Sequence, residues 1–399
     1  MLGSFKFNRM ELAGAMGDLG TLLPIAIAMV LINGLDPMGL FVSVALFYIA
    51  SGIYFGVTVP VQPMKVIGAY AIATAMEPGQ ILASSLLMGG LLLLVGATGA
   101  IEAIRKLTAK SVIRGVQLST GALLIAGGVK FIVGTSKLQI LRQAAEPYLA
   151  VQAVGPVGIG IIIGAIGGIV TLLLLDNRRF PAGVIVVAGG LISGVVLGAR
   201  VDPATVDLGL HLPEILPFTC PGKADFSFAL LVLVLPQIPM TLGNAVLAYT
   251  DLSGQYFGED SSKVTNRKAC ISMGLANLLS FSLGGMPLCH GAGGLAAHYR
   301  FGARTAGSNL MIGLIFLVMA LLLGDSMIGY FNLIPLSILG ILLIFSGAQL
   351  TLTLMDLESR RDYFIATMIL GITLASNLAA GFIIGMILAR LLRWEKLSI

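Results

Sequence analysis

Polar residues that could bind an anion interrupt an apolar stretch early in the chain. Gln62, Pro63 and Lys65 precede an apolar run that ends at Met76. A charged residue at the centre of a membrane helix costs about 2.5–3.5 kcal/mol even on the lenient insertion scale, so such a residue is a functional candidate. We interpret Lys65 as a cation that helps to neutralise an anionic ligand, with the Gln62 amide donating hydrogen bonds. The alternative is a lysine that snorkels to the membrane interface.

A second interruption contains Cys289, His290 and Gly291. Pro63 and Pro287 suit the first turn of a helix, so each proline is predicted to open a short helix. The first N–H groups of a helix are unsatisfied and carry about half a positive charge, and two such helix starts that face each other would bind an oxyanion. His290 could donate to that ligand, take part in proton coupling, or serve only in packing. Cys289 is interpreted as a small packing residue.

Polar residues also occur inside apolar spans. Asp18 would repel an anion, so we interpret it as a proton carrier or as a partner of Lys65; capping of a local helix break is an equal alternative. Thr21 follows in the same motif and is grouped with Asp18 as a coupling or cavity residue. Gln237 and Asn244 interrupt an apolar span in the second half and are interpreted as cavity-lining residues. Helix kinking at the adjacent prolines is the alternative there.

The composition shows what kind of protein must position these residues. Of the 399 residues, 57% are hydrophobic and only 11% are charged, and the mean hydropathy is +0.98. Soluble domains carry about 25% charged residues, and a soluble fold of the present composition would expose large apolar patches. A soluble enzyme and a nucleic-acid-binding protein are therefore excluded. The net charge of +5 is attributed to cytoplasmic loops.

Hydropathy predicts where the chain crosses the membrane, since a helix needs about 20 apolar residues to do so. Twelve stretches are candidates: 11–34, 38–57, 80–101, 114–134, 155–175, 182–199, 226–250, 268–284, 305–324, 326–352, 363–376 and 377–394. Two further segments, 58–76 and 285–300, are interrupted by proline or glycine, and each is third in its half. Interrupted segments at matching positions are typical of transporter sites built from inverted repeats.

We therefore predict an all-α polytopic membrane protein with 14 transmembrane segments, arranged as two inverted repeats of seven. The third and tenth segments would be short half-helices, each preceded by a short extended segment. With the N-terminus in the cytoplasm, 18 of the 24 Lys and Arg residues fall on the cytoplasmic side, 5 fall outside, and Lys65 lies in the membrane. This asymmetry obeys the positive-inside rule. Both termini are expected in the cytoplasm, and the protein is expected in the cell (inner) membrane.

Motifs of other chemistries are missing from the sequence. There is no GxxxxGK[ST], HExxH or GxSxG motif, so neither a built-in ATPase nor a hydrolase is expected. Three cysteines at wide spacing predict neither a disulfide framework nor a zinc site, and three histidines are too few for a multi-histidine metal site. We expect no enzyme activity, no cofactor and no metal.

Four segments resemble the molybdate transporter family, a compact branch of the sulfate permease superfamily. They are 17–21 (Gly-Asp-Leu-Gly-Thr), 60–65 (Pro-Val-Gln-Pro-Met-Lys), 286–295 (Met-Pro-Leu-Cys-His-Gly-Ala-Gly-Gly-Leu) and 299–304 (Tyr-Arg-Phe-Gly-Ala-Arg). The resemblance implies a core domain (1–110 and 225–325) that moves against a gate domain (111–200 and 326–399). It also implies a substrate held between two groups of residues: Gln62, Pro63 and Lys65, and Cys289, His290 and Gly291. The chain ends at Ile399, so no STAS domain is expected, and a homodimer would use membrane helices.

The residues and the resemblance together predict a secondary active transporter that imports molybdate. Import of a dianion against an inside-negative potential costs about 2.3 kcal/mol per charge per 100 mV, so coupling to a cation, most simply a proton, is expected. Asp18 and His290 are the titratable candidates. A transporter of sulfate or another oxyanion on the same fold is the nearest alternative. A nucleobase-type proton symporter would want an acid in the eighth span, where this chain has Gln237 and Asn244. A passive anion channel also stays open.

Overall fold

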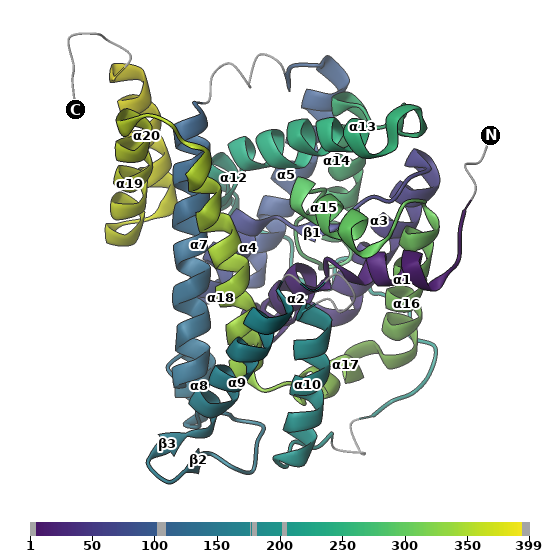
Figure 1. The fold of residues 1–399 in the computed structure, drawn as a ribbon, viewed down its shortest axis with the longest axis vertical. Helices are drawn as coiled ribbons and strands as arrows, with labels where there is room; N and C mark the ends of the chain where they lie inside the picture. The colour runs from purple at the N-terminus through teal and green to yellow at the C-terminus, as the bar shows by residue number, and fades with distance from the viewer. Residues whose placement is uncertain (1–4, 102–108, 176, 178–181, 202–205, 393–399) are drawn as a thin grey trace.

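The computed structural model describes residues 5–101, 109–175, 177, 182–201 and 206–392, which form a mostly helical molecule (Figure 1). The helices of the first half are α1 (Arg9–Met16), α2 (Leu19–Asn33), α3 (Pro37–Phe55), α4 (Lys65–Thr74), α5 (Pro78–Thr98), α7 (Lys110–Val133), α8 (Lys137–Arg142), α9 (Ile159–Leu174) and α10 (Ala182–Val196). A small hairpin, β2 (Ala153–Val154) and β3 (Val157–Gly158), precedes α9.

The second half is helical in the same way. Its helices are α11 (Lys223–Phe228), α12 (Leu235–Met240), α13 (Tyr249–Phe257), α14 (Asn266–Ser282), α15 (Ala292–Phe301), α16 (Gly307–Leu323), α17 (Met327–Phe331), α18 (Leu336–Leu352), α19 (Arg360–Ala375) and α20 (Leu378–Leu391). Short 3₁₀ turns are η4 (Gly258–Ser261), η5 (Gly324–Ser326) and η6 (Thr353–Asp356). Six basic residues that entered the orientation prediction lie outside the described residues: Arg105, Lys106, Arg178, Arg179, Arg393 and Lys396.

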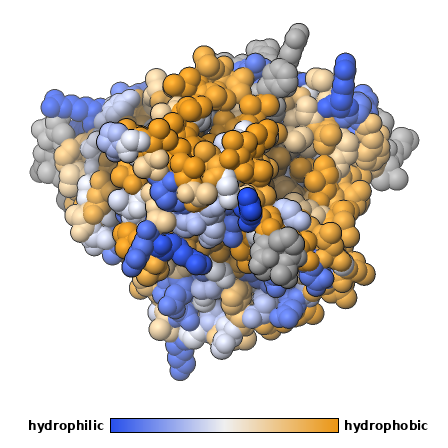
Figure 2. All heavy atoms as spheres, turned by 90° about the horizontal axis from the view of Figure 1, so that it is seen from below, coloured by the Kyte–Doolittle hydropathy of each residue, from blue (hydrophilic) through white to orange (hydrophobic). Residues whose placement is uncertain are grey.

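The described residues contain six helices that are long and apolar enough to cross a membrane: Pro37–Phe55, Pro78–Thr98, Lys110–Arg142, Lys223–Ser261, Gly307–Phe331 and Leu336–Asp356. α1 and α2 are bent by 49° and make a seventh if they are counted as one span, whereas α4, α9, α10 and α20 are apolar but shorter. Seen from below, hydrophobic side chains cover much of the surface, and hydrophilic ones gather in the middle and lower part of this face (Figure 2). The chain is thus a helical, multi-pass membrane protein.

Helix boundaries follow from local capping. Asp36 precedes α3 and accepts the N–H of Gly39 at 2.6 Å, and Pro37 occupies the first helical position, where a missing N–H costs nothing. The break between α1 and α2 differs, because the carboxylate of Asp18 caps no backbone N–H there. It is bonded instead to the Gln62 side chain, so the break places a carboxylate in the interior.

Each short helix follows a two-residue strand. β1 (Gln62–Pro63) pairs antiparallel with β4 (Leu288–Cys289), so that Gln62 lies opposite Cys289 and Pro63 lies opposite Leu288. Two segments that are more than 220 residues apart therefore meet in the middle of the molecule, and the half-helices α4 and α15 start from this meeting point. A short extended segment does precede each half-helix.

The two prolines do not open these helices. Pro63 lies in β1 and Pro287 lies just before β4, whereas α4 begins at Lys65 and α15 begins at Ala292. The N–H of Met64 donates to the carbonyl of Pro287 at 2.8 Å. The prediction that the prolines start the helices is wrong, because pairing between the two segments keeps the backbone around both prolines extended.

The helices pack as two sets. The α7 set (α7, α9, α18, α19 and α20) includes the long helices at the left of Figure 1. In the half-helix set (α1–α5 and α11–α16), α3 packs on α16, α5 packs on α14, and α1 packs on α15. Contacts of α4 and α12 with α7, and of α2 with α18, join the two sets.

Glycines allow the closest approach in the α7 set. Gly121 on α7 faces Gly347 on α18, and Gly128 faces Gly340; a Cβ at any of the four would lie 2.6 Å or less from the carbonyl oxygen of its partner. Small residues at such crossings let helix backbones pack tightly in a membrane, where no hydrophobic effect drives helices together.

The span that contains α12 is irregular. π-helical turns, η2 (Ala229–Val234) and η3 (Thr241–Ala248), flank α12 on both sides. Pro236 and Pro239 lie in α12 and cannot donate backbone hydrogen bonds, which favours such widened turns. From this irregular span, Gln237 reaches the start of α4, and Asn244 lies near the residue that precedes α15.

Candidate anion-binding site

Buried asparagines hold the two extended segments in place. Asn277 on α14 accepts the N–H of Leu288 at 3.0 Å and donates to its carbonyl at 2.7 Å. Asn309 on α16 does the same for Val59, with both bonds at 2.8 Å. Backbone groups that no helix satisfies therefore find partners in the interior, where leaving them unpaired would be costly. The half-helices accordingly start from fixed positions.

A cavity of about 370 Å³ lies between the two helix sets. The half-helix set contributes Gly20, Thr21, Lys65, Asn244 and Gly293 to its lining. The polar residues that the α7 set and its following turn contribute are Gln117, Thr171, Ser346, Gln349 and Thr353, with Phe345 among the apolar ones. A polar cavity between two packed bodies is the expected form of a transporter site.

Lys65 is the one charged side chain among the described residues that line this cavity. It is the first residue of α4 and is partly exposed. No ion pair or hydrogen bond joins its ammonium group to another described residue. The cavity therefore contains a cation that forms no direct ion pair.

The starts of the two half-helices are not equivalent. At α4, the Oε1 of Gln237 accepts the N–H groups of Val66 and Ile67, at 3.0 and 3.3 Å, and its Nε2 donates to Thr241 at 2.8 Å. The N–H groups of Val66 and Ile67, in the first turn of α4, are thus already bonded to a side chain. Gln237 does not line the cavity.

At α15, no side chain caps the helix start. The N–H groups of Ala292, Gly293 and Gly294 have no hydrogen-bond acceptor among the described residues. Gly293 lines the cavity, and a Cβ placed on it would meet no atom within 4 Å. Free N–H groups beside open space at a helix start are suited to an anion.

A buried carboxylate–amide pair lies behind this helix start. The Gln62 Nε2 lies 2.6 Å from Asp18 Oδ1 and 2.7 Å from Oδ2, and both side chains are buried. A Cβ on Gly294 would lie 2.6 Å from Asp18 Oδ2 and 2.7 Å from Gln62 Nε2, so glycine is required there. The side chain of Thr21, three residues after Asp18, interacts with Asp18, and Thr21 also lines the cavity.

His290 is turned away from the cavity. Its Nδ1 lies 2.9 Å from the carbonyl of Pro60, and its Nε2 lies 3.2 Å from Ser272 Oγ. The rings of Phe47 and Tyr249 lie 4.7 and 5.0 Å from the imidazole, centroid to centroid. The histidine therefore fixes the extended segments and the surrounding aromatic cluster, and it does not line the cavity.

The ten residues singled out in the sequence lie at three depths. Lys65, Thr21 and Asn244 line the cavity; Asp18, Gln62, Gly291 and Gln237 lie behind the half-helix starts; Pro63, Cys289 and His290 lie in or beside the strand pair. The polar residues of the α7 set were missed. Hydroxyl and amide side chains are common in membrane helices, and only a cavity distinguishes those that face a ligand.

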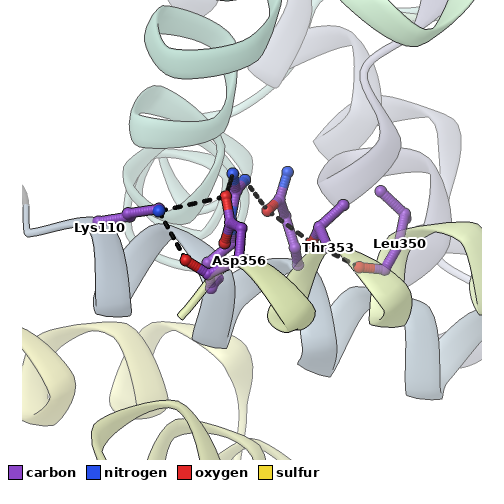
Figure 3. Close-up of polar contacts among 6 residues, drawn as sticks. Lys110, Leu350, Thr353 and Asp356 are labelled. Carbon is purple, nitrogen blue, oxygen red and sulfur yellow. Dashed lines mark hydrogen bonds and ion pairs between the residues drawn. The ribbon is translucent and has the colours of Figure 1, made fainter. Parts of the chain in front are cut away.

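A polar cluster on the α7 set borders the cavity, and four of its residues are labelled in Figure 3. The Oε1 of Gln117 accepts bonds from Arg114 Nη1 at 2.7 Å and from Thr353 Oγ1 at 2.9 Å. Arg114 also forms an ion pair with Asp356, whose carbonyl accepts a bond from Lys110 Nζ at 2.7 Å. The carboxylate of Asp356 therefore compensates the charges of Lys110 and Arg114, whereas no described residue forms an ion pair with Lys65.

Metal chemistry has no support from side-chain geometry in the described ranges. No group of three or more His, Cys, Asp or Glu residues there could hold a metal ion.

Comparisons with known proteins identify a family of transporters. A family model described as "Molybdate transporter of MFS superfamily" matches residues 10–124 and 229–350. "Molybdate transporter 2" of Arabidopsis thaliana is 31% identical over 97% of this chain and 88% of its own length. "Molybdate transporter 1" of Chlamydomonas reinhardtii is 30% identical over 94% of this chain and 90% of its own length.

Solved structures show the fold. The transmembrane domain of the cyanobacterial bicarbonate transporter BicA superposes with a TM-score of 0.66 at 16% identity, over 97% of this chain and 98% of that domain. The inward-facing murine anion transporter Slc26a9 gives 0.69 at 15% identity, over 97% of this chain and 68% of its own. The fold is thus that of the sulfate permease and Slc26 transporters, and the curated relatives are transporters, not enzymes. With more than half of its length matched by the family model, this chain belongs to the molybdate transporter family.

Proposed function

We propose that this protein is a secondary active transporter that imports molybdate across the cytoplasmic membrane. One observation carries the proposal: the unpaired cation of Lys65 and the uncapped start of α15 border the same cavity between the two helix sets. The names of its relatives support molybdate as the oxyanion.

The chemistry of the cavity fits a tetrahedral dianion. Lys65 supplies a full positive charge, the N–H groups of α15 supply partial charges and directed donors, and Asn244 and Gln349 supply neutral polar groups. Together these groups would replace the hydration of the anion. Gly293, which lines the cavity, allows a ligand to approach the backbone closely.

The proposed architecture has 14 spans in two inverted repeats of seven. The packing supports this architecture, because α3 on α16 and α14 on α5 are equivalent pairs under such a symmetry. The two glycine crossings between α7 and α18 are equivalent in the same way: Gly121 with Gly347, and Gly128 with Gly340. Residues 1–110 and 225–325 would form the core, and residues 111–200 and 326–399 would form the gate. Movement of the core against the gate would expose the cavity to each side in turn.

The proposed orientation places both termini in the cytoplasm. Lys110 at the start of α7 and Arg390 near the end of α20 would then face the cytoplasm, whereas α8 and the β2–β3 hairpin, at the opposite end of Figure 1, would face outward. The excess of basic residues on the first side supports this orientation.

Proton coupling is part of the proposal, and Asp18 is the preferred proton carrier. Both ring nitrogens of His290 are engaged away from the cavity, whereas Asp18 lies directly behind the start of α15 and is connected to the cavity by Thr21. A proton on Asp18 would remove a negative charge from the vicinity of the anion.

Ligand binding by the purified full-length protein tests this function. Titration calorimetry with molybdate, tungstate, sulfate and uracil should detect binding of oxyanions and none of uracil. Lys65→Met should weaken oxyanion binding by roughly tenfold or more, since a hydrogen bond to a charged group is worth about 1.5–3 kcal/mol. The matched control Lys137→Met, on exposed α8, should bind as the wild type does. Binding of uracil alone, or an unchanged affinity in Lys65→Met, would contradict the proposal. Tighter binding of sulfate than of molybdate would favour a sulfate transporter on the same fold.

A further inference from the structure

Gln62 has one amide atom with partners and one without. Its Nε2 donates to both carboxylate oxygens of Asp18 at 2.6 and 2.7 Å. Its Oε1 is buried and has no hydrogen-bond partner in the described part of the chain. A buried acceptor without a protein partner is unfavourable, so this oxygen is open to a further donor.

The unpaired oxygen points at the anion-binding end of α15. A Cβ on Gly291 would overlap Gln62 Oε1 and would lie 3.7 Å from Asn244 Nδ2. Gly291 directly precedes α15, and Asn244 lines the cavity. One end of the Gln62 amide therefore faces a carboxylate, and the other end faces the start of the helix whose N–H groups are free.

We propose that the Gln62 side-chain amide turns by 180° when Asp18 takes up a proton, and that this turn presents the Nε2 donor toward the anion. Gln62 is in this sense a positioning residue that links the proton to the substrate. The inference rests on the proposed function in the cavity and specifies how that function is coupled.

Hydrogen-bond roles fix the two states. When Asp18 is charged it only accepts, so Gln62 must direct its Nε2 toward the carboxylate and its Oε1 toward α15. A protonated Asp18 has an O–H group that can donate to Oε1, which then replaces Nε2 beside the carboxyl group. The amide has nearly the same shape in both orientations, so the turn needs no movement of the backbone. The only covalent change is one O–H bond on Asp18, formed with a proton from cavity water and broken when that proton leaves with the anion.

The surroundings of Asp18 favour this coupling. The charged and titratable groups that face it are Lys65 on α4, Tyr48 on α3 and Cys289 on β4. Tyr48 donates its hydroxyl to the carbonyl of Val61 at 3.2 Å, so Lys65 is the neighbour whose charge matters. When Asp18 is charged, its negative charge partly offsets the positive charge of Lys65. When Asp18 is protonated, the positive charge of Lys65 is available to the anion. The turn of Gln62 changes the affinity in the same direction as this electrostatic effect.

The pH dependence of molybdate binding separates the two effects. We expect the affinity of the wild type to rise on acidification, by a factor of roughly 5–150 between the plateaus. Gln62→Met keeps the side-chain length but has no amide, and it should reduce that ratio by at least about fivefold. Asp18→Asn should bind with no pH dependence in this range, because the asparagine N–H₂ always donates to Gln62 Oε1. An unchanged ratio in Gln62→Met would overturn the inference and leave the electrostatic effect alone.

A spectroscopic readout needs neither ligand nor transport. Infrared difference spectra of protein labelled with ¹³C in the glutamine side-chain carbonyl should show a shifted carbonyl band on acidification. The band should be missing in Gln62→Met and in Asp18→Asn. If the wild type shows no difference band, the turn of Gln62 is excluded, even if molybdate binds. If a band appears but no oxyanion binds, the proposed function is refuted and the turn of Gln62 stands. Melting temperatures identify any variant that fails to fold.

Discussion

Neighbouring glycines at the start of α15 have opposite surroundings. A Cβ on Gly294 would lie 2.6–2.8 Å from Asp18, Gln62 and Pro60, whereas a Cβ on Gly293 would meet nothing within 4 Å. Gly294→Ala should therefore lower the free energy of unfolding by about 1–3 kcal/mol through overpacking. Thermal unfolding in detergent measures this loss, and Gly293→Ala serves as the matched control. Equal melting temperatures for the two variants would show that the buried pair is not packed against α15 as described.

Some residues of the candidate site could be singled out from the sequence and others could not. Lys65 stands out because a cation inside an apolar segment is costly, and this signal belongs to a single residue. The role of Gln237 depends on Val66 and Ile67, which are about 170 positions earlier, and no local pattern indicates such a partner. His290 has the right residue type for proton coupling, but its direction is set by Pro60 and Ser272.

At the scale of elements, glycine contacts set the spacing of α7 and α18. A Cβ on Gly128 would overlap the carbonyl oxygen of Gly340, whereas one on the adjacent Gly127 would meet no atom within 4 Å. Gly128→Ala should destabilise the protein by about 1–3 kcal/mol. Gly127→Ala should be neutral or stabilise it by up to about 1 kcal/mol, because alanine favours helix. Chemical denaturation of both variants tests this; a Gly128→Ala variant as stable as Gly127→Ala would contradict the crossing.

The start of α18 carries a pH-dependent contact. Glu146, between α8 and β2, accepts the N–H groups of Leu336 and Ser337 at 2.8 and 2.9 Å. Burial raises the pKa of Glu146 above its usual value of 4.5, against the opposing effect of these bonds. The folded state therefore holds this proton more tightly, and the stabilisation that the group provides is complete below about pH 4.5 and is lost as the pH rises through the raised pKa.

Removing this carboxyl group should make the effect visible. The melting temperature of the wild type minus that of Glu146→Gln should fall as the pH rises, since only the wild type then carries a buried charge. Melting curves of both proteins from acidic to neutral pH measure the difference. A difference that grows with pH would mean that capping of α18 outweighs the cost of burial.

Helices could be predicted where the hydropathy of a whole segment indicates them. The stretch predicted at 80–101 is α5 (Pro78–Thr98), and the stretch predicted at 268–284 is α14 (Asn266–Ser282). The starts of the half-helices could not be predicted, because they depend on the pairing of Pro63 with Leu288. These two residues are far apart in the sequence, so no local pattern indicates their contact. Proline tolerates both a first helical turn and an extended strand end, so the residue type alone does not decide.

At the scale of the whole molecule, the proposed function depends on two packed bodies with a polar cavity between them. Lys65, Asn244 and Gly293 belong to the half-helix set, whereas Gln117, Ser346 and Gln349 belong to the α7 set. An anion bound by both would change its contacts whenever the sets move relative to each other. In the proposed mechanism, binding and movement would be linked in this way, as alternating access requires.

Uptake of molybdate into proteoliposomes with an acidic exterior is the most direct test of the whole proposal. We predict saturable uptake by the wild type that falls when the pH gradient is collapsed. Lys65→Met should lose most of this uptake at subsaturating molybdate, and Lys137→Met should retain it. Wild-type uptake no faster than that of empty liposomes, or equal uptake by Lys65→Met and the wild type, would contradict a molybdate transporter with its site in this cavity.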